Sequence, residues 1–226
     1  MHFPQACLFD LDGVLLDTEG LHSEAWLKTA TTFGSTLNDE QLTKLKGQRR
    51  IDCAQEIINW TKGEQSVEEL LKIHQPISRK LMLNAKEMSG AKDLILWCIS
   101  NSLPMALVTS SSASSVEFKS ASNTWLKLIE TRVYGDDERL KNGKPAPDPY
   151  LLAAEKLNTS PGSCWALEDS YSGVISASSA GCQVWVLDPK NNIESQELPV
   201  KSLTKPYRIK SLEEFLTQLK FLQNRN

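Results

Sequence analysis

The chain has 226 residues, a formal net charge of -3, and a composition that is 40% hydrophobic and 23% charged. This length allows one substantial core, or a core domain with a smaller inserted domain. The small negative charge gives no long-range attraction to nucleic acid or to acidic membranes, so we expect neither as a partner.

The first predicted strand, Ala6–Phe9, is followed by a long region with helical patterns and no convincing strand. Within residues 17–88, apolar spacing and glycine or Asn-Asp punctuation predict successive helices at about 18–33, 39–45, 50–61, 66–74 and 76–86. A helical insert at this point would lie above the carboxyl end of the first strand, as a lid over a site there. We therefore predict a cap domain at residues 17–88 and a core domain made of residues 1–16 and 89–226.

The rest of the chain alternates short apolar runs with helical patterns. The further predicted strands are Met105–Val108, Arg132–Tyr134, Cys164–Leu167 and Val184–Leu187. The predicted helices are Val116–Ile129, Pro149–Leu157, Gly173–Ala180 and Ser211–Leu222, the last with Ser211 as N-cap and Glu214 completing a capping box. Most of the strands are continuously apolar, which suits parallel strands buried on both faces. The alternation predicts a doubly wound, Rossmann-like parallel α/β sheet, and residues 188–210 are read as a loop before the last helix.

Cysteine usage and the N-terminus both indicate a reducing compartment. The five cysteines are scattered and form no Cys-x-x-Cys pair, so we interpret them as buried thiols, with zinc or disulfides as the alternative. Residues 1–5 lack a basic region, and the apolar run Leu94–Ile99 is too short to span a bilayer. We therefore expect no signal peptide and a cytoplasmic location.

Two aspartates directly follow the first strand, in the motif Asp10-Leu11-Asp12-Gly13. Carboxylates this close repel each other unless a cation or a shared proton separates them. Ligands of open α/β sheets gather at the carboxyl ends of strands, so this motif indicates a site where a metal ion and a substrate meet. Asp-x-Asp-Gly also occurs in turns and calcium loops, but Val14-Leu15-Leu16 supplies none of the further ligands of an EF-hand.

Three further motifs are predicted at the same edge of the sheet. Thr109-Ser110-Ser111-Ser112 follows the second strand and offers hydroxyls and free amides to an anion, or simply caps the next helix. Lys144 opens a proline-rich turn that can direct its ammonium at a phosphate, unless it is merely solvated. Glu168 and Asp169 follow the fourth strand, and Asp169 is a candidate Mg²⁺ ligand or a helix cap. The combination is what metal-assisted phosphoryl transfer requires.

With these four motifs in order, the chain resembles the haloacid dehalogenase-like (HAD) superfamily over nearly its whole length. The likeness is greatest to its beta-phosphoglucomutase-like and sugar-phosphatase members, whose helical cap residues 17–88 resemble. The resemblance implies that Asp10 is a nucleophile that forms an aspartyl-phosphate, and that Asp12 is the general acid and then the base. Dehalogenating members lack this second acid, so carbon–halogen hydrolysis is not expected.

The same resemblance assigns a metal site and a phosphate site. Mg²⁺ would be held by Asp10, by the backbone carbonyl of Asp12 and by Asp169, with Glu168 in support. The phosphate-binding residues would be Thr109, the amide of Ser110, and Lys144, which would also neutralise Asp10.

In the cap, Asp17–Trp26 and Leu45–Arg50 are similar to stretches of beta-phosphoglucomutase. This likeness makes His22, Gly47 and Arg50 candidate substrate-binding residues. An exposed or packed helix histidine is the alternative for His22, and a solvated charge is the alternative for the arginine at position 49 or 50.

Two departures from the mutase pattern reduce the expected positive charge of the site. His74 stands where the mutase has a cap lysine linked to its histidine, and Ser112 stands where it has a lysine after the serines. A bisphosphorylated intermediate needs that charge, whereas a phosphatase does not.

We therefore predict a monomeric, Mg²⁺-dependent phosphatase of small phosphorylated metabolites, chiefly sugar phosphates. A helical lid should exclude phosphoproteins from the site. The alternatives are a beta-phosphoglucomutase-like sugar phosphomutase and a non-catalytic module that binds phosphate or metal.

Overall fold

A six-stranded parallel sheet lies at the centre of the computed structural model, which describes residues 2–189 and 205–225. The strand order is β5-β4-β1-β6-β7-β8, and every neighbouring pair is parallel. The strands are β1 (Ala6–Phe9), β4 (Met105–Val108), β5 (Thr131–Val133), β6 (Cys164–Glu168), β7 (Gln183–Leu187) and β8 (Tyr207–Ile209). In the middle of the sheet, Leu8 of β1 is paired with Ala106 on one side and Ala166 on the other. The carboxyl ends of β1, β4 and β6 are therefore neighbours, and the predicted doubly wound fold is confirmed.

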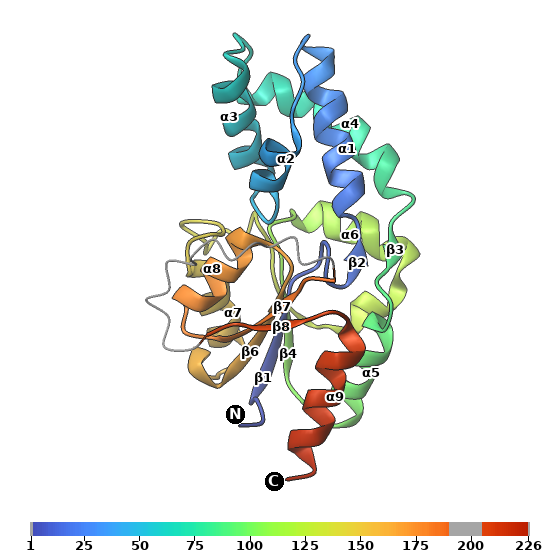
Figure 1. The fold of residues 1–226 in the computed structure, drawn as a ribbon, viewed down its shortest axis with the longest axis vertical. Coiled ribbons are helices and arrows are strands. Elements are labelled where there is room, and N and C mark those ends of the chain that lie inside the picture. The colour runs from blue at the N-terminus through green and yellow to red at the C-terminus, as the bar shows by residue number, and fades with distance from the viewer. Residues whose placement is uncertain (1, 190–204, 226) are drawn as a thin grey trace.

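Helices cover both faces of this sheet (Figure 1). One face carries α5 (Ala91–Ser100), α6 (Ala113–Ser122) and α9 (Leu212–Gln223), and the other carries α7 (Asp148–Lys156) and α8 (Tyr171–Ser179). Alternate residues of β1 enter the two apolar clusters, with Phe9 in the first and Leu8 in the second. Burial on both faces explains why the strands are continuously apolar.

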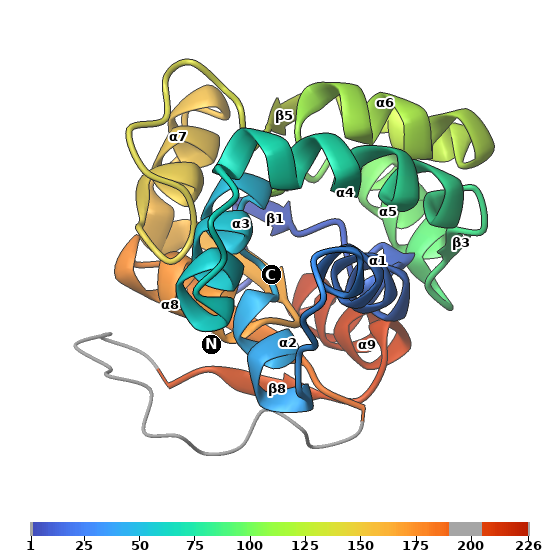
Figure 2. The ribbon, with the colours of Figure 1, turned by 90° about the horizontal axis from the view of Figure 1, so that it is seen from above.

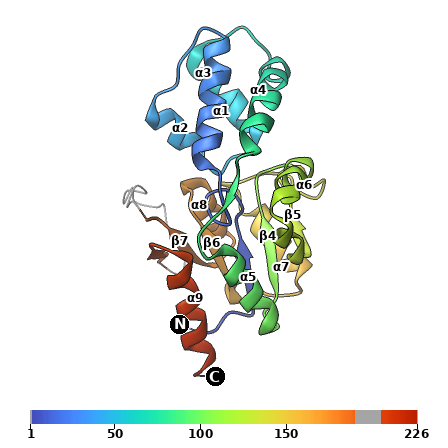
Figure 3. The ribbon, with the colours of Figure 1, turned by 90° about the vertical axis from the view of Figure 1, so that its right-hand side faces the viewer.

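Four helices form a second body beyond the carboxyl ends of the strands (Figures 1 and 3). They are α1 (Glu19–Thr32), α2 (Asp39–Leu45), α3 (Arg50–Thr61) and α4 (Val67–Met82). They enclose an apolar cluster of their own that includes Trp26, Leu45, Ile57 and Leu70. Seen from above, they lie over the core (Figure 2), as a lid over the sheet edge would.

The chain enters and leaves this helical body through a short antiparallel pair, β2 (Leu16–Asp17) and β3 (Lys86–Glu87). The prediction that residues 17–88 hold no strand is wrong at this pair. Two-residue strands show no apolar alternation, and both residues of β3 are exposed. The predicted boundary between residues 16 and 17 falls inside β2, and the one between residues 88 and 89 follows β3.

The predicted break before Pro76 is also wrong, because α4 runs through that residue as one helix. An internal proline removes one helical hydrogen bond and costs about 3 kcal/mol. One face of α4 is buried along its whole length, through Leu70, His74, Ser78 and Met82. Packing of that face offsets the local cost.

Several other boundaries differ from the prediction. The segment predicted as helix 116–129 divides at Asn123 into α6 and a 3₁₀ turn, η1 (Thr124–Leu128), and α5 and β8 were not predicted. A second 3₁₀ turn, η2 (Pro161–Ser163), precedes β6. Ser211 caps α9 as expected, but the Glu214 carboxylate accepts from the amide of Lys210 instead of completing a capping box.

Most of the predicted loop at residues 188–210 lies outside the described residues, apart from its two ends. All five cysteines are buried and free, which confirms the interpretation as buried thiols. No helix in the described part of the chain has the length and apolar character needed to cross a membrane.

Candidate active site

The carboxylate of Asp10 is buried at the carboxyl end of β1 and pairs with a buried ammonium. Nζ of Lys144 lies 2.6 Å from Oδ1 of Asp10 and 2.5 Å from Oε1 of Glu168, and it donates to the Val108 carbonyl at 3.0 Å. Residues that follow β1, β4 and β6 thus meet around one cation. Burial by itself would lower the pKa of Lys144, but the two carboxylates raise it above its usual value and keep the ammonium charged. A merely solvated Lys144 is excluded.

Three carboxylates form an acidic cluster beside this ammonium. Oxygen atoms of Asp10, Glu168 and Asp169 lie within 4.8 Å of one another. Burial, together with repulsion between the carboxylates, raises the pKa of Asp10 and of Asp169 well above the usual range. A divalent cation would relieve that repulsion, and carboxylate oxygens are the ligands that Mg²⁺ prefers.

The loop after β1 lies directly against this cluster. A Cβ atom at Gly13 would fall 1.9 Å from Oδ2 of Asp169, and the φ angle of Gly13 is +84°. Glycine is therefore required for the loop to pass so close. The alternative of a capping role for Asp169 is excluded, since Ser170 caps α8 by accepting from the amide of Gly173 at 3.0 Å.

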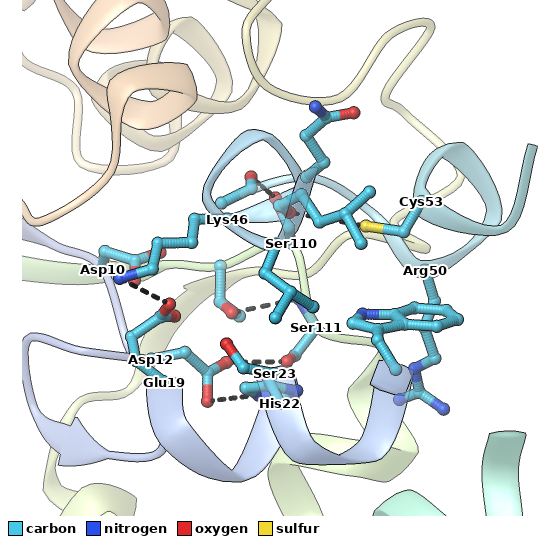
Figure 4. A pocket seen from close by; sticks show the side chains of 16 residues that line it. Asp10, Asp12, Glu19, His22, Ser23, Lys46, Arg50, Cys53, Ser110 and Ser111 are labelled. Atoms are coloured by element: carbon cyan, nitrogen blue, oxygen red, sulfur yellow. Dashed lines mark hydrogen bonds and ion pairs between the residues drawn. The ribbon is translucent and has the colours of Figure 1, made fainter. Parts of the chain in front are cut away.

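The carboxylate of Asp12 lies outside the acidic cluster and is surrounded by donors. Its Oδ1 accepts from Oγ1 of Thr18 at 2.5 Å. The same Oδ1 lies 3.1 Å from Nε2 of His22, and Oδ2 accepts from Oγ of Ser111 at 2.9 Å (Figure 4). The ammonium of Lys119 forms an ion pair with the same Oδ1. Burial by itself would raise the pKa of Asp12, but Lys119 and His22 hold it well below the usual range. Asp12 is therefore ionised.

In the hydroxyl-rich segment after β4, one residue caps the next helix and others line the cavity. Ser112 caps α6, with its side chain accepting from the amide of Ser115 at 3.3 Å. Thr109 and Ser110 both line the cavity, and Thr109 accepts from the amide of Ser111. The capping alternative thus applies to Ser112 and leaves Thr109 and Ser110 for an anion.

The cavity above Asp10 lies between core and cap, is partly open to solvent, and has a volume of ≈ 60 Å³. From the cap, His22, Gly47 and Arg50 line it, together with the ring of Trp26 (Figure 4 labels His22 and Arg50). From the core, the lining residues are Asp10, Asp12, Thr109, Ser110 and Ser111. The structure therefore brings together all of the predicted site residues except Lys144, Glu168 and Asp169, which lie behind Asp10.

The cap touches the core at Gly47, whose carbonyl accepts from Oγ of Ser110 at 2.7 Å. A Cβ atom at Gly47 would fall 2.1 Å from Oγ of Ser170, and its φ angle is +72°. The choice between the two predicted arginines is also resolved. Arg49 pairs with Asp52 at 2.8 Å, whereas Arg50 lines the cavity.

His74 contributes no charge to this cavity. Its ring stacks on Trp26 with the centroids 3.6 Å apart, and Nδ1 lies 3.1 Å from Oγ1 of Thr29. Burial, together with the charge of Arg50, lowers the pKa of His74 to about 3, so the ring is neutral.

In the mutase pattern a cap lysine accompanies the histidine, and here Lys119 of the core supplies a positive charge near His22 instead. Lys119 belongs to none of the predicted motifs. Its Nζ lies 3.4 Å from Nε2 of His22 and 3.2 Å from Oγ of Ser111. The available signal was its position on α6, three residues after the buried Val116 and therefore on the same inward face. Tyr150 was missed as well, and its hydroxyl donates to Glu168 at 2.5 Å.

Comparison with known proteins gives one consistent set of relatives. A family model described as haloacid dehalogenase-like hydrolase matches residues 7–187. A Drosophila melanogaster protein named "Probable pseudouridine-5'-phosphatase" is 37% identical over 189 residues, which cover 81% of this chain and 82% of that protein. A Thermotoga maritima protein named "Phosphorylated carbohydrates phosphatase" is 31% identical over 180 residues, which cover 79% of this chain and 82% of that protein.

A solved structure extends the likeness to the fold as a whole. The crystal structure of a beta-phosphoglucomutase from Clostridium difficile matches with a TM-score of 0.75, covering 99% of this chain and 100% of that one. At 21% identity, this match shows a shared fold alone.

Proposed function

Because this chain belongs to the haloacid dehalogenase-like hydrolases, we propose that it is a Mg²⁺-dependent phosphatase of small phosphate monoesters, acting through an aspartyl-phosphate. The observation that carries the proposal is the position of the Asp10 carboxylate. It lies 2.6 Å from the Lys144 ammonium, belongs to the acidic cluster, and lines the cavity that the cap covers. A nucleophile, its counter-cation and a metal site are thus next to the space where a phosphate would bind.

In the first step, a carboxylate oxygen of Asp10 attacks phosphorus, the ester P–O bond breaks, and the leaving oxygen takes a proton from Asp12. Asp12 is ionised in the free protein, so this step requires it to be protonated in the complex with the substrate. Thr109 and the amide of Ser110 bind phosphate oxygens, and the charge of Lys144 opposes the rise that burial gives to the pKa of Asp10. Asp10, Asp169 and the Asp12 carbonyl, with Glu168 in support, would hold Mg²⁺, which would supply neutralising charge to the phosphoryl group and the carboxylates.

In the second step, water attacks phosphorus, the bond to Asp10 breaks, and Asp12 takes the proton of the water. Asp12 must be a carboxylate for this step, which agrees with its low pKa. The proton it gains is the one that it gives to the leaving oxygen of the next substrate. Each residue therefore returns to its initial state.

The substrate class that we propose is a phosphate carried on a sugar. Both named relatives support it, because pseudouridine 5'-phosphate carries its phosphate on ribose and the other name refers to carbohydrates. In the cap, His22 and Arg50 offer a polar ring and a cation to the group beyond the phosphate, and Trp26 offers an apolar face. The cavity between cap and core is partly open to solvent, and movement of the cap would let such a substrate enter and would then cover it.

The test is phosphate release from a panel of sugar phosphates, nucleoside monophosphates and one folded phosphoprotein, with and without Mg²⁺. Asp10→Asn serves as the blank. We expect Mg²⁺-dependent release from one or a few sugar phosphates. Efficient release from the folded phosphoprotein would contradict the small-substrate part of the proposal.

A sugar phosphomutase is the second candidate, and one observation favours it. His22, Gly47 and Arg50 line the same cavity as Asp10, as the resemblance to beta-phosphoglucomutase implies. A mutase would convert β-glucose 1-phosphate into glucose 6-phosphate with a bisphosphate primer and release little phosphate. Rapid phosphate release without isomerised product would exclude it.

A further inference from the structure

Lys119 places a fully buried ammonium beside the candidate acid and base. The residue belongs to α6, its side chain has 0% exposure, and its Nζ pairs with Oδ1 of Asp12. The α6 helix begins directly after the segment that holds Thr109 and Ser110. One element therefore follows the phosphate-binding segment and also carries a cation to Asp12.

The donors around Asp12 are distributed unequally between its two oxygens. Oδ1 has three neighbours, Thr18, His22 and Lys119, whereas Oδ2 accepts from Ser111 alone among the described residues. A carboxylate oxygen has lone-pair capacity for about two hydrogen bonds, so Oδ1 is saturated and Oδ2 is not. Oδ2 is thus the oxygen with capacity for a proton.

Lys119 also connects the partners of the two oxygens. Besides Asp12, its Nζ lies 3.2 Å from Oγ of Ser111 and 3.4 Å from Nε2 of His22. Of the three N–H donors of the ammonium, two go to Asp12 and Ser111, whereas Nε2 of His22, as a donor to Asp12, lies near Nζ without accepting from it. Because Lys119 contacts both the Oδ1 side and the Oδ2 donor, it restrains rotation of the carboxylate.

Stability alone does not explain a lysine at this position. Removing an ammonium from water is costly, and a well-packed apolar side chain in place of a buried ion pair is often neutral or stabilising. The partner that offsets the cost here is the candidate acid and base itself. A role in positioning that carboxylate accounts for the charge.

We propose that Lys119 is a positioning residue, which holds Oδ1 of Asp12 so that Oδ2 exchanges the proton with the leaving oxygen and with water. The inference rests on the proposed phosphatase function, and it adds the residue that sets the direction of the acid and base. Because Lys119 is closed off from the cavity, it acts through Asp12 rather than on the substrate.

The test is a double-mutant cycle with p-nitrophenyl phosphate, comparing the wild type, Lys119→Met, Asp12→Ala and the double variant. Effects of residues that act as a unit do not add. We expect Lys119→Met to lower steady-state kcat by about 10–100-fold, less than the roughly 10²–10⁴-fold of general acid–base catalysis because the Asp12 carboxylate remains, and to have no further effect in the Asp12→Ala background. A purely structural role would give the same factor in both backgrounds and would overturn the proposal.

The first turnover gives a second, independent readout. p-Nitrophenolate leaves without protonation, so phosphorylation of Asp10 by this ester needs no acid, whereas hydrolysis of the aspartyl-phosphate needs the base. We expect Lys119→Met to show a burst of about one p-nitrophenolate per site before its slow steady state. Wild-type kcat in this variant, or loss of the burst together with kcat, would overturn the proposal.

Two further variants make the outcome unambiguous. Lys119→Gln keeps a donor and is expected to recover part of kcat, and it replaces Lys119→Met in the cycle if the latter does not fold. Lys156→Met is the matched control, because Nζ of Lys156 lies 2.7 Å from Oδ2 of Asp137 and neither residue lines the cavity. We expect this variant to keep the kcat of the wild type. If the wild-type protein is no faster than Asp10→Asn, the proposed phosphatase function is overturned. If the wild-type protein is active and Lys119→Met has the same kcat, only the positioning role of Lys119 is overturned.

Discussion

The ammonium of Lys144 lies 2.6 Å from the carboxylate of Asp10, although the two residues are 134 positions apart in the chain. The contact depends on the central position of β1 between β4 and β6, since Lys144 also reaches Val108 at the end of β4 and Glu168 at the end of β6. A candidate nucleophile and its counter-cation are thus brought together by the order of the strands.

Asp10→Asn should abolish turnover while keeping the fold, because an amide is a poor nucleophile and Lys144 retains its contact with Glu168. Thermal unfolding and phosphate release, measured on the same preparation, check the two halves of this prediction. A variant that folds and still turns over near the wild-type rate contradicts the role of Asp10.

Added Mg²⁺ should raise the unfolding temperature, because a ligand that binds only the native state stabilises it, by about 2.7 kcal/mol at a hundred times its Kd. The shift should vanish in Asp169→Asn, which removes one carboxylate of the acidic cluster without breaking the Lys144 ion pairs. Asp52→Asn, an acid of the cap that pairs with Arg49, is the control that should keep the shift. Equal shifts in both variants would show that Mg²⁺ binds elsewhere.

Gly47→Ala should raise KM and lower kcat, because its Cβ would fall 2.1 Å from Oγ of Ser170 and would push the cap loop off the core. Gly34→Ala is a matched control with the same φ of +72° and open space around the Cβ position. Both variants bear the left-handed backbone strain of about 1–2 kcal/mol, but only the first is expected to change the kinetics. Steady-state kinetics of the pair separates strain from contact, and equal kinetics would contradict a role for Gly47 in closing the cap.

The stability of the cap should fall as the pH drops from about 6.5 toward 3. Burial lowers the pKa of His74 to about 3, whereas an unfolded histidine titrates near 6.5. Between these values the unfolded state binds a proton that the native state does not, so the free energy of unfolding decreases as pH falls.

The matched variant for this effect is His74→Phe, which keeps a ring on Trp26, while Thr29 still donates to the Ala25 carbonyl. Between pH 7 and pH 5 the wild type should lose about 2 kcal/mol more stability than this variant in urea unfolding. Parallel pH dependence in the two proteins would contradict a neutral, buried His74.

The core part of the candidate site could be predicted because three of its four motifs lie at the carboxyl ends of buried strands. Asp10, Thr109 and Glu168 come at the ends of β1, β4 and β6, and the carboxyl ends of parallel strands meet at one edge. Apolar runs locate those strands reliably, since both faces of the sheet are buried. The local apolar pattern therefore locates the strands, and the parallel sheet then brings the residues at their carboxyl ends close together.

Lys119 could not be predicted in this way, since its partner Asp12 is brought to it by packing of α6 against the sheet. A lysine among serines on a helix is typical of a solvated face, and only the inward direction set by Val116 indicates burial. The strand β8 was missed for a related reason, because its Tyr207 and Arg208 are exposed and give no apolar run.

The central claim is a covalent phosphoryl group on Asp10 during turnover. The most direct measurement is mass spectrometry of protein quenched in acid while it hydrolyses p-nitrophenyl phosphate, with Asp12→Ala used to accumulate the intermediate and Asp10→Asn as the blank. We predict one phosphoryl group on the peptide that contains Asp10, present in Asp12→Ala and absent from Asp10→Asn. Sustained phosphate release by the wild type, with no phosphoryl group on Asp10 in either active protein, would contradict the account.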